Sequence, residues 1–174
     1  LVHDGGAAPV AIDACGEAAR LADMAFYMGR GLEAIPSRGP LAALTVAGAV
    51  SGWQAALSAA AGWGPALQLE RLFEDAIHYA RHGMAVTRAQ TSDTAAKRGE
   101  MGESPGFAEH FLPGGSEPAE GDVFRQPAMA ETLERLARDG LDSFYRGELA
   151  GDIAADLEAA GSPVRRNDLD GHRA

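Results

Sequence analysis

The sequence contains few of the residues that characterise several protein classes. Cys15 is the only cysteine among 174 residues, which excludes an intrachain disulfide framework and is compatible with a reducing or indifferent environment. No apolar run reaches the roughly 18–20 residues that cross a bilayer as a helix. The chain begins without an initiator methionine and without the basic segment of a signal peptide. The sequence therefore leaves two alternatives open, a fragment or a processed product, and it indicates no compartment.

Basic residues are also scarce. The chain carries 15 Lys and Arg against 25 Asp and Glu, a formal net charge of −10, and Arg165-Arg166 is only a pair. This balance argues against a nucleic-acid surface, because phosphate binding needs a basic patch. The length suits one domain with a single core. We therefore expect a single domain over residues 1–174 that neither binds nucleic acid nor crosses a membrane.

Glycine and proline divide the chain into mostly helical segments. Asp4-Gly5-Gly6 separates two short β-like runs and predicts a hairpin, while residues 41–46 predict a short buried strand. Thr87 is expected to cap a polar surface helix, and Asp142 a short helical turn. Apolar residues recur at helical spacing in five segments: residues 20–28, 53–60, 69–80, 127–139 and 149–157. This balance predicts an α+β fold that is predominantly helical.

The residue types that perform catalysis do not form a complete site. His78 and His82 have the spacing of a zincin helix, but no glutamate follows the first histidine. Two solvated histidines near a helix end are the simpler interpretation, so we predict no metal site. The glycine pairs lack the third glycine of a dinucleotide fingerprint, and Ser51 is one place off the nucleophile-elbow spacing. By its residues alone, the chain is an incomplete enzyme or a non-catalytic helical interaction domain.

Cys15 is the one candidate nucleophile. A thiol becomes reactive when a nearby histidine or a helix N-terminus lowers its pKa, and the next predicted helix begins soon after this residue. A single cysteine among small residues is more often a buried packing group. Both interpretations remain open on the residues alone.

The order of several stretches resembles the gamma-glutamyltranspeptidase family. The resemblance runs over essentially the whole chain and is similar to the middle of that family's large subunit. Ala47 departs from the pattern, because the family often has proline there. The most specific stretches are VAGAVSGW (46–53), DAIHYARHGMAV (75–86), RQPAMAETLERLARDGLDSFYRGELA (125–150) and NDLDGHRA (167–174).

The resemblance implies an N-terminal-nucleophile hydrolase with an α/β/β/α sandwich, in which this chain is a predominantly helical part of the large subunit. In that family a precursor cleaves itself, and a threonine at the new N-terminus of the small subunit attacks a γ-glutamyl amide. The α-amine of this threonine serves as the base. The resemblance therefore implies a small-subunit partner that carries the nucleophile, with no catalytic residue, metal or cofactor in this chain.

The resemblance also gives Cys15 a different meaning. In gamma-glutamyltranspeptidases, Asp-Gly-Arg-Glu follows the hairpin, and its arginine pairs with the substrate α-carboxylate. Residues 13–16 occupy these places, so Cys15 stands where that arginine is expected. A thiol cannot replace the two parallel hydrogen bonds of a guanidinium. The usual recognition of a γ-glutamyl group is therefore in question.

The oxamate amidohydrolase branch of the family is similar in IDACGEAA (12–19) and in the stretch around residues 35–53. Its substrate is a small amide acid that has no glutamyl α-carboxylate. We therefore expect Cys15 and Gly16 to line a substrate pocket, with γ-glutamyl compounds and small amide acids as the alternative substrates. If the substrate is γ-glutamyl, Arg20 or Arg38 must supply the cation. Hydrolysis and acyl transfer both remain open.

Overall fold

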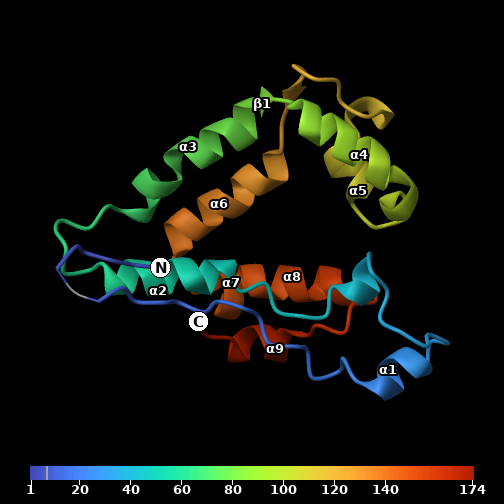
Figure 1. Cartoon of the computed structure of the whole chain (residues 1–174), viewed down its shortest axis with the longest axis horizontal. Coiled ribbons are helices and arrows are strands. Elements are labelled where there is room, and N and C mark those ends of the chain that lie inside the picture. Colours follow the sequence, from blue (N-terminus) through green and yellow to red (C-terminus); the bar gives the residue numbers. More distant parts are fainter. Residues whose placement is uncertain (7) are drawn as a thin grey trace.

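Helices form most of the regular structure in the computed structural model, which describes residues 1–6 and 8–174 (Figure 1). Two short strands, β1 (Met84–Ala85) and β2 (Val123–Phe124), pair antiparallel. This confirms the predicted α+β, predominantly helical fold class. The helices are α1 (Met24–Met28), α2 (Ala49–Ala59), α3 (Leu69–His82), α4 (Arg88–Met101), α5 (Phe107–Phe111), α6 (Pro127–Asp139), α7 (Ser143–Arg146), α8 (Glu148–Ala159) and α9 (Arg166–Gly171), with 3-10 turns η1 (Pro40–Ala42) and η2 (Pro113–Gly115).

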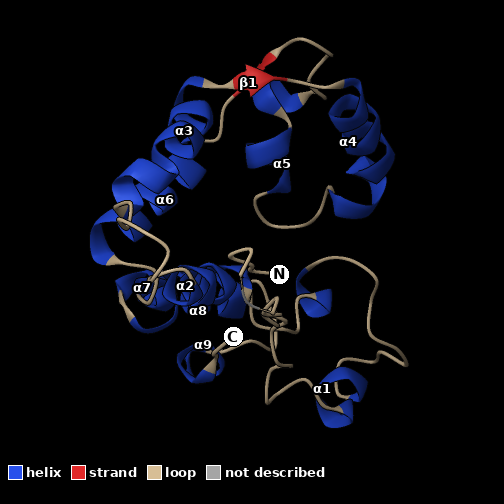
Figure 2. Ribbon diagram, turned by 60° about the vertical axis from the view of Figure 1, so that its left-hand side comes forward, coloured by secondary structure: helices blue, strands red, loops and turns tan. Residues whose placement is uncertain are grey.

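The helices are arranged around two packed groups. Helices α7, α8 and α9 contact one another, and α3 packs along α6. The β1–β2 pair joins the upper ends of α3 and α6, and α4 lies across this pair from them in both views (Figures 1 and 2). The amide of Gln126 donates to the carbonyl of Ala80 at 2.8 Å, which ties the start of α6 to the end of α3.

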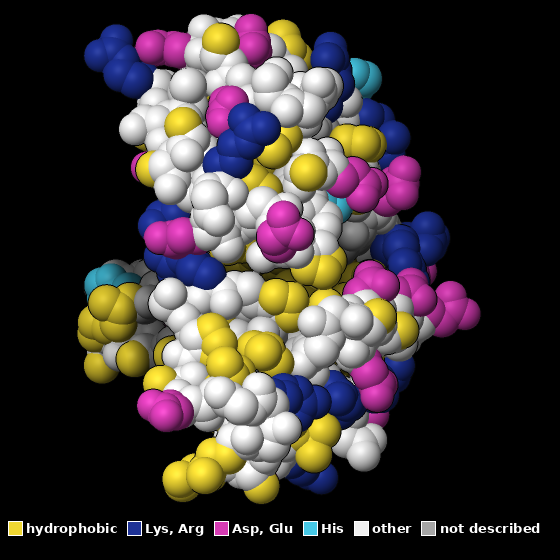
Figure 3. All heavy atoms as spheres, turned by 90° about the vertical axis from the view of Figure 1, so that its right-hand side faces the viewer, with side chains coloured by type: hydrophobic (Ala, Val, Ile, Leu, Met, Phe, Trp, Pro, Cys, Tyr) yellow, Lys and Arg dark blue, Asp and Glu magenta, His cyan; other side chains and the backbone are white. Residues whose placement is uncertain are grey.

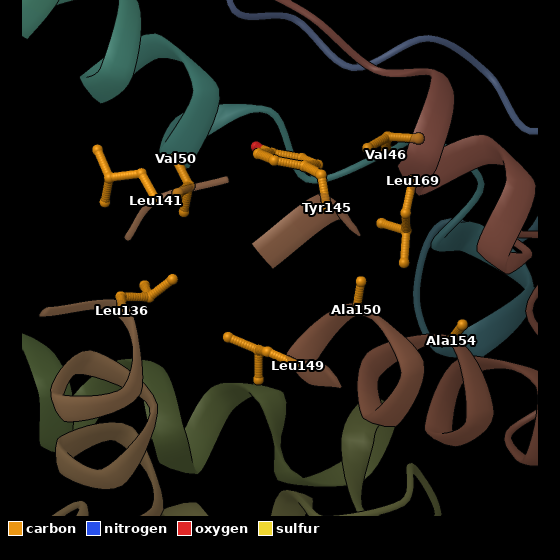
Figure 4. Close-up of a cluster of buried hydrophobic side chains, with 9 residues drawn as sticks. All are labelled: Val46, Val50, Leu136, Leu141, Tyr145, Leu149, Ala150, Ala154 and Leu169. Atoms are coloured by element: carbon orange, nitrogen blue, oxygen red, sulfur yellow. The ribbon is translucent and has the colours of Figure 1, made fainter. Parts of the chain in front are cut away.

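The main core lies where α2, α6, α7, α8 and α9 meet (Figure 4). Tyr145 is fully buried at its centre. Each buried aliphatic side chain stabilises the fold by about 1.5–3 kcal/mol relative to its exposed state. Leu69 and Phe73 of α3 are only partly buried against this core. The buried members are Val46, Val50, Leu136, Leu141, Tyr145, Leu149, Ala150, Ala154 and Leu169.

Several helix boundaries follow the local signals in the sequence. Thr87 Oγ1 accepts the amide of Gln90 at 3.1 Å and caps α4, as predicted. Pro127 opens α6 at a position where its missing N–H costs nothing. The prediction for Asp142 is wrong: this residue precedes α7 but makes no side-chain cap, because its carboxylate pairs with Arg146 instead.

The predicted strands are the weakest part of the sequence interpretation. Among residues 1–6 and 8–13, the predicted hairpin pairs by one antiparallel bridge, between Val2 and Val10. Residues 41–46 do not form a strand: a 3-10 turn begins at Pro40, and only Thr45 forms a bridge, to Ala18. Gly39 precedes this turn with a φ of 82°, which directs the chain away from an extended path.

Helix α1 buries a different side chain from those that the apolar pattern predicts, and helix α9 has no apolar pattern that predicts it. In α1 the predicted stripe faces outward, with Met24 at 76% and Met28 at 64% exposure. The buried residue is Tyr27, whose hydroxyl donates to the carbonyl of Leu41 at 3.0 Å. Helix α9 has no long apolar stripe. It is fixed by Asp168, whose carboxylate accepts the amide of Arg165 at 2.8 Å while its own amide donates to the carbonyl of Arg165 at 3.0 Å.

Two backbone segments meet without intervening side chains beside the N-terminus of α2. A Cβ atom on Gly16 would lie 1.6 Å from the carbonyl oxygen of Val46, and one on Gly48 would lie 1.9 Å from that of Ala14. The amide of Val46 donates to the carbonyl of Glu17 at 3.0 Å across the same contact. The segment that contains Cys15 is therefore held directly against the start of α2.

Gly16→Ala should destabilise the protein, because its Cβ must displace main-chain atoms and not a flexible side chain. We expect a loss of at least about 1–3 kcal/mol in the free energy of unfolding, the usual cost of overpacking. Urea denaturation followed by circular dichroism would measure it.

Gly99→Ala is the matched control for this substitution. Gly99 lies inside α4 and a Cβ there meets no atom within 4 Å, so alanine should raise stability by about 0.5–1 kcal/mol. Equal denaturation midpoints for Gly16→Ala and the unaltered protein would contradict the backbone contact.

Candidate functional site

Cys15 lies at the surface of the segment that packs against α2. The carboxylate of Asp13 accepts the amide of Cys15 at 2.9 Å. The hydrogen bond between the Asp13 carboxylate and the thiol, together with the charge of the carboxylate, raises the pKa of Cys15 above its ordinary value. The backbone hydrogen bond from Cys15 lowers the pKa of Asp13. The thiol therefore carries less thiolate at neutral pH than a free cysteine.

A position at a helix N-terminus or a hydrogen bond to a histidine would activate this thiol, and Cys15 has neither among the described residues. Helix α1 begins at Met24 with Asp23 as its cap, so Cys15 is not at the N-terminus of the helix that follows it. No histidine is hydrogen-bonded to Cys15 among residues 1–6 and 8–174. The local chemistry is that of a polar, slightly acidic wall.

Arg20 and Arg38, the two candidates for binding a substrate α-carboxylate, are held by different contacts. Arg38 forms an ion pair with Glu100 at 3.4 Å, and both side chains are about half exposed at 52%. The backbone amide of Arg20 donates to the carboxylate of Asp168 at 3.1 Å. This bond anchors the start of the Arg20 segment to α9 through the main chain.

The histidine pair on α3 lies away from the core. The His78 and His82 rings are 4.8 Å apart, and both side chains are exposed. Within the described part of the chain, no group of three or more His, Cys, Asp or Glu side chains is arranged to hold a metal ion.

A buried polar cluster links α2, α7 and the end of the chain, and the sequence analysis missed it. Ser51 Oγ donates to the carbonyl of Gly48 at 2.8 Å and lies 2.8 Å from His172 Nε2. The Tyr145 hydroxyl accepts the amide of Ser51 at 3.0 Å and donates to the carbonyl of Ala47 at 2.8 Å. We call Ser51, Tyr145 and His172 the Ser51 cluster. Ser51 is 7% exposed and His172 is 2% exposed.

The Ser51 cluster is not arranged for nucleophilic catalysis. A serine nucleophile must give its proton to a histidine that accepts it. Here we assign the Ser51 proton to the carbonyl of Gly48, an assignment that goes with the His172 tautomer in which Nε2–H donates to the serine oxygen. The cluster therefore fixes positions rather than moving a proton.

The surroundings of His172 are polar. A cavity of about 180 Å³ is lined by residues that include Ser51, Asp142, Arg146 and His172. Arg146 donates to the carbonyl of His172 at 2.6 Å. Two buried atoms, Arg146 Nε and His172 Nδ1, have no hydrogen-bond partner among the described residues.

Sequence signals for this cluster were weak because its members are far apart. Ser51 and His172 are separated by 121 positions, and Ser51 and Tyr145 by 94. Of the three residues, Ser51 alone stands near a recognisable motif spacing, and that spacing belongs to another type of site, the nucleophile elbow. The histidine lies in a polar terminal stretch where no periodicity indicates burial.

A larger apolar groove lies between the end of α2 and the start of α3. It has a volume of about 750 Å³, and its lining includes Leu57, Trp63, Leu67, Leu72 and Leu141.

The face shown in Figure 3 carries basic and acidic side chains interspersed, with no broad basic surface. Of the helices in the described ranges, none is long and apolar enough to cross a membrane.

Comparisons with known proteins agree on one family. The family model for gamma-glutamyltranspeptidase matches residues 1–174. An oxamate amidohydrolase proenzyme from Klebsiella pneumoniae is 51% identical over 167 residues, which cover 95% of this chain and 31% of that protein. A glutathione hydrolase-like proenzyme from Bacillus subtilis is 34% identical over 144 residues, covering 83% of this chain and 27% of that protein. The aligned part of the chain thus spans between a quarter and a third of the length of these relatives.

Solved structures show the same relationship. A cephalosporin acylase from Bacillus halodurans has a TM-score of 0.80 and 29% identity, covering 92% of this chain and 30% of that one. A gamma-glutamyltranspeptidase from Pseudomonas nitroreducens has a TM-score of 0.76 and 28% identity, covering 91% and 45% respectively. These neighbours have the N-terminal-nucleophile hydrolase fold. Together with the full-length family match, they establish that this chain belongs to the gamma-glutamyltranspeptidase family.

Proposed function

We propose that this chain is part of the large subunit of an amidohydrolase that acts on a small amide acid such as oxamate. The observation that carries the proposal is the exposed thiol of Cys15, hydrogen-bonded to Asp13, at the place where the family pattern has an arginine. The 51% identity to an oxamate amidohydrolase proenzyme, against 34% to a glutathione hydrolase-like proenzyme, supports the same choice.

The substrate preference follows from charge and desolvation. A γ-glutamyl substrate brings an α-carboxylate, and burying a carboxylate without a partner is costly. The neighbouring Asp13 carboxylate, which accepts the amide of Cys15 at 2.9 Å, is an acceptor and cannot take the place of the missing cation. The carboxylate of a small amide acid such as oxamate is bonded directly to the amide carbonyl, so it does not extend to the place of a glutamyl α-carboxylate beside Cys15 and Gly16. These residues then act as pocket walls.

The chemical step belongs to a partner subunit. Both relatives are described as proenzymes, which supports a precursor that is cleaved into two subunits. The N-terminal threonine of the small subunit then attacks the amide carbonyl, and its α-amine takes the hydroxyl proton. The residues of this chain bind and orient the substrate, and we propose that residues 1–174 do so as one domain without metal or cofactor.

The complete processed enzyme should prefer oxamate-like amides over γ-glutamyl amides in kcat/KM. Cys15→Arg should raise kcat/KM for a γ-glutamyl amide by about ten-fold or more, because a charge-assisted hydrogen bond contributes roughly 1.5–3 kcal/mol. Steady-state kinetics on both substrate classes would measure the change. Strong γ-glutamyl activity in the unaltered enzyme would contradict the proposal and direct attention to Arg20 or Arg38.

Cys15→Ser is the control, since it keeps a small polar wall and removes the thiol. We expect kcat for the small amide to stay within about three-fold, because the thiol takes no part in bond breaking. A collapse of kcat with folding intact would mean that Cys15 is a nucleophile.

The raised pKa of Cys15 gives a second, independent prediction. Asp13→Asn removes the charge that raises this pKa, so the pKa should fall and the thiolate fraction at neutral pH should increase. Iodoacetamide should then alkylate Cys15 faster at pH 7, while the two rates should converge at a pH above both pKa values. An unchanged rate at pH 7 would show that Asp13 does not control the thiol.

A further inference from the structure

We propose that His172 is a positioning residue for the substrate-binding segment 13–16, acting through Ser51 and Gly48. This inference rests on the proposed function, because it concerns the wall that contains Cys15. It assigns a role to a buried imidazole that takes no part in the proposed chemistry.

The first step is the direction of the hydrogen bonds. Ser51 Oγ has one proton, which it donates to the carbonyl of Gly48. The short contact to His172 is therefore a donation from Nε2–H to Ser51 Oγ at 2.8 Å. His172 holds the serine hydroxyl in the one orientation that restrains the carbonyl of Gly48.

The second step is the close approach at Gly48. A Cβ atom at this position would lie 1.9 Å from the carbonyl oxygen of Ala14 and 3.1 Å from His172 Nε2. The histidine ring and the substrate-binding segment therefore approach the same side of Gly48. A Cβ on Gly52 would likewise meet the side chain of Ala14 at 2.7 Å. Because the ring and the main chain of Ala14 both lie against Gly48, we infer that a shift of the ring displaces Gly48 and, through it, Ala14 and Cys15 beside it.

The third step is the unpaired nitrogen. His172 Nδ1 is buried and has no partner among the described residues. An apolar side chain of similar size would avoid the desolvation cost of this acceptor. The imidazole is therefore poorly explained by packing alone, and its Nε2–H donor is the feature that a leucine could not provide.

The surrounding elements restrain the ring itself. Tyr145 of α7 packs against it with ring centroids 5.2 Å apart. Arg146 donates to the main-chain carbonyl of His172 at 2.6 Å and also pairs with Asp142. The ring is thus fixed from α7, and it in turn fixes the start of α2.

The test compares two substitutions in the complete processed enzyme. His172→Leu removes the donor, whereas His172→Gln keeps an N–H donor at nearly the same distance from the main chain. We expect His172→Leu to raise KM for the small amide by about five-fold or more with kcat within about two-fold, as for a lost binding contact. His172→Gln should restore KM to within about two-fold of the unaltered enzyme.

Two further variants separate positioning from general instability. Ser51→Ala removes the acceptor and should reproduce the effect of His172→Leu. Leu149→Ala weakens the same core by creating a cavity, but it leaves the Ser51 cluster intact and should leave KM unchanged. If Leu149→Ala raises KM as much as His172→Leu does, the role of His172 is merely structural and the proposal is wrong.

Hydrogen exchange supplies a readout that needs no substrate. Peptides covering residues 13–19 and 44–52 should exchange faster in His172→Leu and Ser51→Ala, but not in His172→Gln or Leu149→Ala. Unchanged exchange in His172→Leu would overturn the proposal whatever the substrate. If exchange responds as expected but no small amide is hydrolysed by the unaltered enzyme, the proposed function fails while the positioning of residues 13–16 by His172 stands.

Discussion

The contact between the main chain at residues 14–17 and the main chain at residues 46–48 is the constraint on which the candidate site depends. Glycine at positions 16 and 48 lets two backbones approach to distances that exclude any Cβ atom. This contact fixes the position of the Cys15 segment relative to α2. Helix α2 in turn packs into the main core through Val50. The exposed segment is therefore joined to the main core chiefly by a direct contact between main-chain atoms.

Two kinds of interaction hold the start of α2 in place, and they have different roles. Apolar packing supplies most of the stability, because Tyr145 and its neighbours exclude water from a shared core. Polar contacts fix the orientation of the start of α2, because the hydroxyl of Tyr145 accepts the amide of Ser51 and donates to the carbonyl of Ala47. One side chain therefore contributes its ring to the core and its oxygen to the Ser51 cluster.

Local signals in the sequence predicted the helices better than the strands or the site. Thr87 caps α4 by a hydrogen bond to its near neighbour Gln90, and Pro127 opens α6 through its fixed φ. Both signals are local, so they act whatever the rest of the fold does. A strand needs a partner, and residues 41–46 pair only through Thr45. The family resemblance indicated Cys15 and Gly16, whereas the cluster of Ser51 and His172 depends on a contact across the whole chain, which no periodicity records.

The Asp13 carboxylate beside Cys15 affects how readily this thiol is oxidised. Peroxides attack thiolates far more readily than thiols, and exposed low-pKa cysteines are the ones that proceed to sulfenic and sulfinic acids. Cys15 is exposed, and the hydrogen bond and charge of Asp13 raise its pKa, so its thiolate fraction at neutral pH is lower still than that of an ordinary cysteine. This exposed sulfur is therefore a slower target for peroxides than an equally exposed cysteine without a neighbouring carboxylate.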